Sequence, residues 1–352
     1  MRILFLGEAL SSHLLRWAEE FKKLDWEVLV ASCDYDDKFT GHKLTSKYPA
    51  GPLRYLSLVG QIKQLIAEFQ PFVVNAHFLP TYGLAAALAN VHPLILTLWG
   101  SDILVSGSRG FWARRRSRFV LGRSDLIVAD AECLLAAARQ LGPVRRHLVV
   151  SFGVRRSWYE SGKERELSEG ETLRIISTRQ HEEIYDLPTL LRAAKILLEE
   201  DFPLELTISG SGSLESTLRQ LTSELGLAGK TVFVGRLSEE RMFSTLRNAD
   251  IYVSTSRSDS TSVSLLEAMS QKLYPVVTDI PGNREWLENE VHLFPIGDAE
   301  VLAQRIKRGA VALARQAAYD EYEPKLRQRG IREQQMQAAH ETFLNLIDEF
   351  RH

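Results

Sequence analysis

Residues 251–278 read IYVSTSRSDSTSVSLLEAMSQKLYPVVT and contain a strand, a loop, a helix and a second strand. The apolar runs at 251–254 and 275–277 have the length and composition of buried strands. Between them, a polar loop leads into helical spacing at 262–271. This order predicts a right-handed crossover between two parallel strands, so the stretch indicates the fold class.

The same alternation continues through all 352 residues. In the first half, short apolar runs predict strands at 3–6, 28–31, 72–75, 95–98, 126–129 and 148–151. The helical patterns between them lie at 12–24, 60–69, 80–90, 112–121 and 132–141. In the second half, we expect strands at 173–177, 204–209, 231–234, 251–254, 275–277 and 292–294. The matching helices are expected at 187–199, 214–225, 239–248, 262–271, 283–288 and 299–314. The sequence therefore predicts an α/β protein with two doubly wound, parallel-sheet, Rossmann-like domains that face a cleft.

Polar residues interrupt this alternation once, in the stretch GKERELSEGE. We expect a first domain at 1–156, a linker at 157–172 and a second domain at 173–330. The last segment, 331–352, should form a helix that returns to the first domain. Its apolar stripe consists of Met336, Ala339, Phe343, Ile347 and Phe350.

Composition excludes several classes of protein. Apolar residues make up 45% and charged residues 25% of the chain, and the formal net charge is −2, so we do not expect a dedicated nucleic-acid binder. Cys33 and Cys133 are far apart and lie in no metal-ligand pattern, which favours a cytoplasmic protein without disulfide bonds or zinc. The longest apolar stretch, 83–99, contains Asn90, His92 and Pro93, so no membrane span is expected.

The loop and helix that follow the strand at 251–254 have the features of a phosphate site. Three small polar residues, Ser260, Thr261 and Ser262, precede a helix whose first N–H groups have no partner within the helix. Those groups and the helix dipole favour an anion such as a diphosphate. Asp259 and Glu267 lie on either side, where their carboxylates could hold the hydroxyls of a ribose and a sugar.

This segment resembles the nucleotide-sugar signature of retaining glycosyltransferases of family 4, the glycogen-synthase-like group with the GT-B fold. That signature has two acidic residues separated by seven others, then Leu-Glu-Ala-Met and a Pro-Val-Val strand. Here the acids are Asp259 and Glu267, the second within LLEAM, and Pro275 begins the Pro-Val-Val strand. The first acid departs from the family pattern because it is an aspartate instead of a glutamate.

The resemblance implies roles for residues across the second half. Arg179 matches the family arginine that neutralises the donor diphosphate, whereas Tyr185 stands where the family has a lysine. The implied catalytic residues are Arg179, Asp259 and Glu267. The implied donor-binding residues are Gly210, Gly235, Arg236, Ser260, Thr261, Ser262, Val263, Ser264 and Tyr185. Alternatively, Arg179 lies on the surface and Tyr185 only staples the next helix.

In the first half, the resemblance implies an acceptor-side domain. The candidate residues there are Ser12, His13, His77 and Asp102. Each also has a structural explanation, because Ser12 and Asp102 could cap helices and the histidines could be satisfied within the core. Trp99 stands where many relatives carry a histidine.

Two further segments contain residue types that can bind a ligand. Asp34, Tyr35 and Asp36 form an Asp-X-Asp pattern, but it lies far from the donor half, so we expect no metal and no cofactor. From Arg109 to Arg123, six arginines are interleaved with Phe111, Trp112 and Phe119. This segment either contacts the inner membrane surface or a phosphate-bearing acceptor, or is a solvated helix.

The resemblance as a whole implies an enzyme that moves a sugar from a nucleotide-diphosphate sugar to an acceptor with retention at the anomeric carbon. The acceptor would be a glycan, a lipid-linked molecule or a small molecule, and the protein would take part in polysaccharide or glycoconjugate biosynthesis. Two alternatives remain, a sugar-nucleotide epimerase of the same fold and a non-catalytic sugar-nucleotide-binding subunit.

Overall fold

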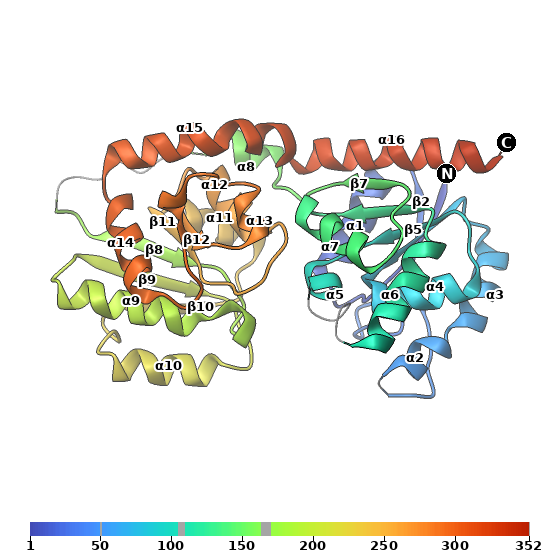
Figure 1. Ribbon diagram of the computed structural model, residues 1–352, viewed down its shortest axis with the longest axis horizontal. Coiled ribbons are helices and arrows are strands. Elements are labelled where there is room, and N and C mark those ends of the chain that lie inside the picture. Colours follow the sequence, from blue (N-terminus) through green and yellow to red (C-terminus); the bar gives the residue numbers. More distant parts are fainter. Residues whose placement is uncertain (50, 105–109, 163–169, 352) are drawn as a thin grey trace. The chain divides into compact units, whose positions relative to one another are not determined.

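The computed structural model describes residues 1–49, 51–104, 110–162 and 170–351 (Figure 1). The chain divides into two compact units, one made of Met1–Phe152 with Glu333–His352 and the other of Gly153–Arg332. Each unit contains one sheet in which every strand pairs in parallel with its neighbours. Each sheet also has its own hydrophobic core. The predicted fold class, two doubly wound parallel-sheet domains, is confirmed.

The sheet of the first unit has the order β3-β2-β1-β4-β5-β6-β7. Its strands are β1 (Arg2–Leu6), β2 (Glu27–Ser32), β3 (His42–Lys43), β4 (Val73–His77), β5 (Leu94–Thr97), β6 (Leu126–Ala129) and β7 (His147–Val149). Its helices are α1 (Ser12–Lys23), α2 (Pro52–Leu56), α3 (Val59–Phe69), the π-helical turn η1 (Phe78–Gly83), α4 (Leu84–Ala89), α5 (Gly100–Leu104), α6 (Phe111–Arg123), α7 (Glu132–Leu141) and α16 (Arg332–Arg351). The sequence did not reveal β3, because this strand has two residues and lies at the sheet edge.

Helix α16 packs onto α1 through aromatic rings. The Phe343 ring lies 5.2 Å from that of Phe21 and 6.3 Å from that of Trp17, centroid to centroid. The other stripe residues Met336, Ala339 and Ile347 are buried as well. Phe350 was wrongly assigned to the buried stripe, because it lies in the last turn and is 47% exposed.

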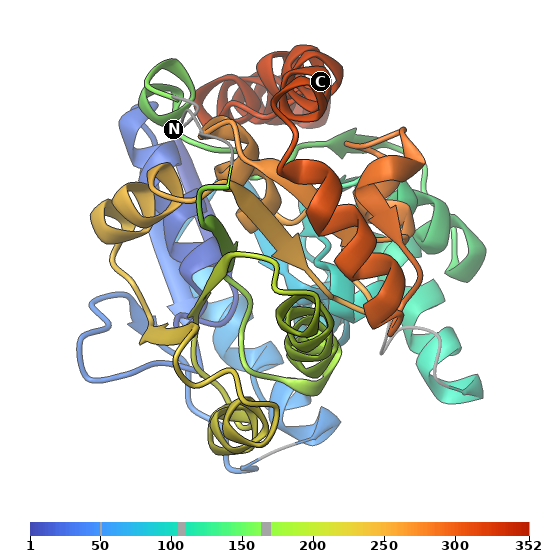
Figure 2. The same cartoon turned by 90° about the vertical axis from the view of Figure 1, so that its left-hand side faces the viewer.

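The sheet of the second unit has the order β10-β9-β8-β11-β12-β13. Its strands are β8 (Leu173–Ser177), β9 (Leu204–Ser209), β10 (Thr231–Gly235), β11 (Ile251–Ser254), β12 (Tyr274–Thr278) and β13 (Leu293–Phe294). Its helices and helical turns are α8 (Arg156–Glu160), η2 (Glu183–Tyr185), α9 (Leu187–Glu199), α10 (Glu215–Glu224), α11 (Glu239–Arg247), α12 (Val263–Ser270), α13 (Pro281–Arg284), η3 (Glu290–His292), α14 (Ala299–Gly309) and α15 (Ala312–Arg329). Figure 2, in which this unit faces the viewer, shows helices on both sides of the sheet.

The boundary between the units differs from the expected linker at 157–172. The chain leaves the first unit after Phe152, and α8 already belongs to the second unit, where Trp158 is buried in the core. Residues 163–169 lie outside the described part of the chain. Gly330 accepts a hydrogen bond from the Val154 N–H and the Val154 carbonyl accepts one from the Arg332 N–H, both at 2.8 Å. The ends of the second unit are therefore neighbours.

Two expected helices also have different limits. The pattern at 299–314 belongs to two helices, because α14 ends at Gly309 and α15 begins at Ala312. The helix expected at 283–288 is the single turn α13, which begins earlier at a proline.

The long apolar stretch at 83–99 folds as α4 and β5. Asn90, in the left-handed conformation with φ of 58°, ends α4 and separates the two elements. Among the described residues, no helix is both long and apolar enough to cross a lipid bilayer.

Candidate active site

The donor-side candidates lie where the strand order of the second sheet reverses. Strands β8 and β11 are neighbours, but the chain continues from β8 to one side of the sheet and from β11 to the other. Arg179 follows the end of β8, and the loop 255–262 follows β11. The carboxyl ends of two such strands form the usual ligand site of an open α/β sheet.

Arg179 is the centre of this group. Its side chain is 8% exposed, and Nη2 lies 2.5 Å from Oδ2 of Asp259. Its Nη1 donates a hydrogen bond of 2.7 Å to Oγ of Ser262. Burial works against the charged form, but the Asp259 carboxylate, together with Tyr252 and Tyr185, outweighs it and raises the pKa of Arg179 above its ordinary value. Arg179 therefore carries a positive charge within the site.

The N-terminus of α12 meets the same guanidinium. Ser262 is the N-cap, and its Oγ accepts from the Leu265 N–H at 3.4 Å. Ser264 Oγ also accepts from Arg179 Nη1, at 3.4 Å. The side-chain cation and the positive end of the helix dipole thus converge, and both favour a bound anion.

Other predicted residues lie in the same loop and in the same helix. Ser260 and Thr261 are buried in the loop, and Val263 is half-buried in the first turn of the helix. Glu267 is half-buried one helical turn beyond Val263, so both side chains lie on one side of α12. This position suits a carboxylate that reaches a group next to the anion.

The glycine loops pack against the backbone of Arg179. Gly210 has φ of +133°, and a Cβ there would collide with the Arg179 carbonyl oxygen. The Gly210 N–H donates to the Gly235 carbonyl at 2.9 Å, which joins the loops after β9 and β10. Arg236 follows in this turn and is exposed. The loops that follow β8, β9 and β10 are therefore joined next to Arg179.

The ring of Tyr185 stacks on the central arginine of this group. Its ring covers the guanidinium of Arg179, with 4.4 Å between Cζ and the ring centroid. The Tyr185 carbonyl accepts from Thr255 Oγ1 at 2.7 Å, and the Ile184 carbonyl accepts from the Arg257 N–H at 2.8 Å. The residue therefore shields and positions Arg179 through its ring.

Three residues of this site escaped the sequence analysis. Tyr252 on β11 is fully buried beside Arg179, and burial raises the pKa of its hydroxyl. Glu182 accepts from the N–H and the Oγ of Ser213, at 2.8 and 2.5 Å, and so ties two loops together. Thr255 holds the Tyr185 carbonyl. No sequence signal marks these contacts, because the partners are 31–73 residues apart in the chain.

In the first unit, two candidate histidines share an aromatic cluster. The Trp99 ring lies 4.8 Å from that of His13 and 5.7 Å from that of His77. Burial lowers the pKa of His13 to about 4 and that of His77 to about 3, so both rings are neutral near pH 7. His77 also contacts Phe5 and Trp17. The side chain of Ser12 lies outside the described part of the chain.

Asp102 has the geometry of a capping residue. It is fully buried in the first turn of α5, and Oδ1 accepts from the Trp99 N–H at 3.0 Å. Oδ2 accepts from the Leu79 N–H at 2.9 Å. Asp102 therefore positions Trp99 against the two histidines, which favours the structural alternative for this residue.

Asp34, the first acid of the Asp-X-Asp pattern, binds other side chains of the first unit. Asp34 lies 2.6 Å from Arg54 Nη2 and accepts a hydrogen bond of 2.7 Å from the Tyr82 hydroxyl. The described residues include no group of three or more His, Cys, Asp or Glu side chains arranged to hold a metal ion.

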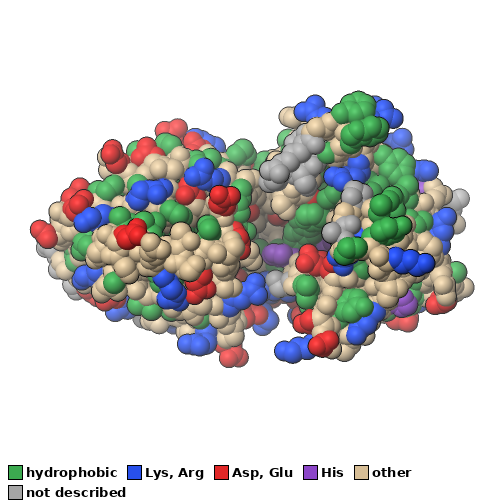
Figure 3. All heavy atoms as spheres, turned by 90° about the horizontal axis from the view of Figure 1, so that it is seen from below, with side chains coloured by type: hydrophobic (Ala, Val, Ile, Leu, Met, Phe, Trp, Pro, Cys, Tyr) green, Lys and Arg blue, Asp and Glu red, His purple; other side chains and the backbone are tan. Residues whose placement is uncertain are grey.

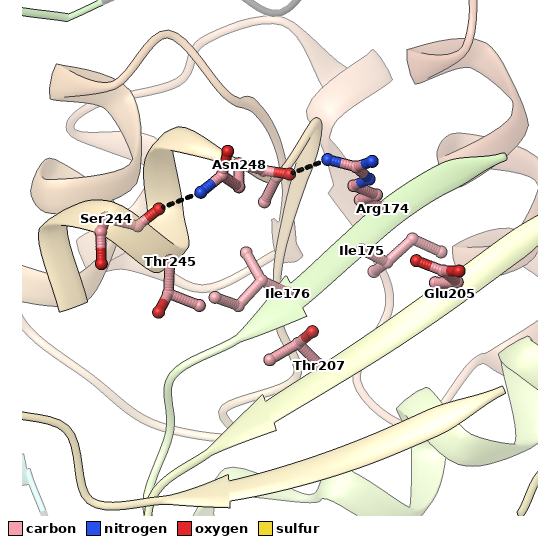
Figure 4. Close-up of a pocket in the computed structure, with 9 residues that line it drawn as sticks. Arg174, Ile175, Ile176, Glu205, Thr207, Ser244, Thr245 and Asn248 are labelled. Atoms are coloured by element: carbon pink, nitrogen blue, oxygen red, sulfur yellow. Dashed lines mark hydrogen bonds between the residues drawn. The ribbon is translucent and has the colours of Figure 1, made fainter. Parts of the chain in front are cut away.

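A separate pocket of about 270 Å³ lies over β8 and β9. Figure 4 shows Ser244 and Thr245 of α11 on one side of it and Glu205 and Thr207 of β9 on the other. Its lining contains none of the predicted donor residues. We assign no chemistry to this pocket, because the phosphate-binding features converge at the strand ends instead.

Two family descriptions match the chain. Residues 2–131 match the family described as Glycosyl transferase 4-like, and residues 160–310 match Glycosyl transferases group 1. The amylovoran biosynthesis glycosyltransferase AmsK of Erwinia amylovora is 29% identical over 262 residues. That alignment covers 69% of this chain and 63% of AmsK.

Solved structures have the same fold at low sequence identity. Anabaena HepE, in complex with UDP and glucose, gives a TM-score of 0.79 at 18% identity and covers 98% of this chain and 100% of HepE. The sucrose-phosphate synthase of Thermosynechococcus elongatus gives 0.82 at 13% identity, with 99% and 100% of the two chains covered. The two regions of the chain are therefore each similar to a glycosyltransferase family, and the fold is the GT-B fold of the solved structures.

Proposed function

We propose that this protein transfers a sugar from a nucleotide-diphosphate sugar to an acceptor, with retention of configuration at the anomeric carbon. The acceptor is a glycan, a lipid-linked molecule or a small molecule. The observation that carries the proposal is the buried guanidinium of Arg179 at the N-terminus of α12. The fold shared with HepE, which binds UDP-glucose, supports a nucleotide sugar as the donor.

The proposed reaction takes place on one face of the sugar. The bond between the anomeric carbon and the diphosphate oxygen breaks while the acceptor oxygen bonds to that carbon. The acceptor proton passes to the departing diphosphate oxygen. Arg179 and the α12 dipole stabilise the negative charge that grows on this oxygen, while Asp259 and Glu267 hold hydroxyls of the sugar and the ribose.

This chemistry assigns no step to a cofactor or a metal. Arg179 and the helix N-terminus supply the positive charge that the leaving diphosphate needs. Activity should therefore persist in excess EDTA. Complete loss that Mg²⁺ or Mn²⁺ restores would contradict this part of the proposal.

The test begins with thermal shifts of the purified chain in nucleoside diphosphates and nucleotide sugars, because a ligand of the folded state raises the melting temperature. The donor that stabilises the protein is then incubated without acceptor, and release of the nucleoside diphosphate is measured. Arg179→Ala should abolish the release, whereas Arg192→Ala, an exposed arginine on α9, should not. No stabilisation and no release with any donor would refute the proposal.

A non-catalytic sugar-nucleotide-binding subunit is the second candidate. It is favoured by Tyr185, a neutral residue at the position where the resemblance expects a lysine. Such a subunit would show the thermal shift without release of the diphosphate. An epimerase would instead convert the donor to a second sugar nucleotide or a free epimer, which product analysis would detect.

A further inference from the structure

One face of α6 exposes aromatic rings and guanidinium groups together. Phe111, Arg115, Phe119 and Arg123 are spaced four residues apart, so they form one stripe along the helix. Phe111 is 65% exposed and Phe119 38%, and the neighbouring Trp112 is 79% exposed. We call these five residues the aromatic-arginine face. Figure 3 shows hydrophobic and basic side chains next to each other on the first unit.

Within this face, each arginine of the stripe lies over a phenylalanine. Arg115 Cζ is 5.6 Å from the Phe111 ring centroid, and Arg123 Cζ is 5.9 Å from that of Phe119. These cation–π pairs hold each guanidinium group next to a phenylalanine ring on the surface of the helix. The stripe therefore presents both kinds of group to the same partner.

The sequence around α6 supplies no acidic residues that could neutralise its arginines. The sequence from 103 to 124 contains no Asp or Glu. Arg114 and Arg118 are also exposed beside the stripe. No ion pair found among the described residues involves Arg114, Arg115, Arg118 or Arg123.

The opposite side of α6 already anchors the helix. Ser117, Val120 and Leu121 are buried, and the two apolar ones belong to the core of the first unit. The exposed rings are therefore not required for the helix to dock. A helix that only needed a solvated outer face would gain nothing from a tryptophan and two phenylalanines in water.

We propose that the aromatic-arginine face binds the surface of a lipid bilayer that contains anionic headgroups. Aromatic side chains prefer the headgroup level of a bilayer, and nearby arginines are attracted to anionic lipid. A single convex helix also matches a flat surface better than a nucleic-acid strand, which proteins usually hold in a groove. This inference does not rest on the proposed catalytic function, because it concerns the first unit alone.

The test is co-sedimentation of the full chain with vesicles of phosphatidylcholine, with or without phosphatidylglycerol. We expect binding to the vesicles that contain phosphatidylglycerol, weaker binding at high salt because charges are screened, and little binding to pure phosphatidylcholine. Quenching by lipids with brominated acyl chains should be stronger in the wild type than in Trp112→Phe, which retains an aromatic ring but loses the fluorophore.

Two double variants separate the contributions of charge and ring. Arg115→Glu with Arg118→Glu, and Phe111→Ser with Trp112→Ser, should each weaken vesicle binding about tenfold or more. The matched controls on the second unit are Arg247→Glu, an exposed arginine that also pairs with a phenylalanine, and Leu313→Ser, whose side chain is 82% exposed. Both controls should bind like the wild type.

Three outcomes would overturn the proposal. They are absence of binding to any vesicle, equal binding to neutral and anionic vesicles, and binding that both double variants retain. Binding of a single-stranded oligonucleotide that the arginine variant loses, without vesicle binding, would instead assign the face to nucleic acid. Unchanged melting temperatures would show that the variants fold.

Discussion

Asp259 Oδ2 lies 2.5 Å from Arg179 Nη2, so the acid and the cation of the candidate donor site are bonded to each other. The pair is largely buried, with 8% of the Arg179 and 21% of the Asp259 side chain exposed. A diphosphate that binds Arg179 must therefore share the guanidinium with Asp259 or displace its carboxylate. Because of this competition, substitutions of Asp259 and of Arg179 should have different effects on diphosphate binding.

Asp259→Asn should make a nucleoside diphosphate bind several-fold more tightly, because the variant removes a negative charge beside the phosphate site. The gain corresponds to about 1 kcal/mol. If the Asp259 carboxylate holds a sugar hydroxyl, as proposed, the same variant should also lower the transfer rate with the complete nucleotide sugar. Calorimetry and turnover measurements test the two effects, and weaker diphosphate binding would contradict the competition.

Arg179→Ala should be nearly inactive, and kcat should fall by a larger factor than the donor KM rises. Charge on the leaving oxygen grows toward the transition state, so the missing cation affects the reaction step more than binding. Arg179→Lys should retain part of the activity. Since the alanine variant leaves Asp259 without its cation, the melting temperature is measured in parallel, and a folded, fully active variant would refute the phosphate site.

Tyr185→Phe should stay within about twofold of the wild-type rate, because the ring that covers Arg179 is retained. Tyr185→Ala should lose activity by an amount equivalent to about 0.5–2 kcal/mol, the range of a cation–π contact. Steady-state kinetics of the two variants distinguish the ring from the hydroxyl. A large defect in Tyr185→Phe would show that the hydroxyl itself contacts the donor.

Glu267→Ala should weaken nucleotide binding by roughly 1.5–3 kcal/mol if its carboxylate accepts ribose hydroxyls. The fold should persist, because the side chain is only half-buried on α12. Glu224→Ala, an exposed acid on α10, is the control for a change in net charge. Equal nucleotide affinity in Glu267→Ala and the wild type would remove Glu267 from the site.

The first unit should lose stability as the pH falls from 6.5 to about 4. His13 and His77 have folded-state pKa values of about 4 and about 3, below the ordinary 6.5, so the unfolded chain binds more protons in this range. For His13 alone the loss is roughly 3 kcal/mol. Denaturant titrations at several pH values should give a smaller pH slope for His77→Gln than for the wild type or the exposed His147→Gln.

Much of the fold was predictable because its signals are local. The helices Glu132–Leu141 and Leu187–Glu199 and the strand Leu173–Ser177 have the predicted limits, since each is a periodic or apolar run with clear ends. Helix α15 was missed beyond residue 314, because half of its 18 residues are charged or carry an amide and it includes Pro324. Its buried residues, Arg315, Ala318, Tyr322 and Leu326, form one narrow stripe. Such a stripe is too weak a periodic signal to be recognised in the sequence.

The candidate site was predictable in its residues but not in their contacts. Two sequence features indicated which residues lie near the strand ends. They are the motif around Glu267 and the glycines of the loops. The pairing of Arg179 with Asp259 joins residues 80 positions apart, and the Tyr185 ring over Arg179 depends on the exact turn at Glu183–Tyr185. Such contacts depend on the tertiary fold, which no local pattern encodes.

The second unit is one continuous segment inserted between the two segments of the first unit. Hydrogen bonds from Val154 to Gly330 and Arg332 hold the two ends of this insertion together. A segment whose two ends meet can be removed, transplanted or circularly permuted with little disturbance of its own core. The first unit, in contrast, consists of two separate segments of the chain, because α16 supplies Phe343 to the cluster of Trp17 and Phe21. The second unit could therefore be exchanged between such chains as one continuous piece, whereas the first unit must be transferred as two segments.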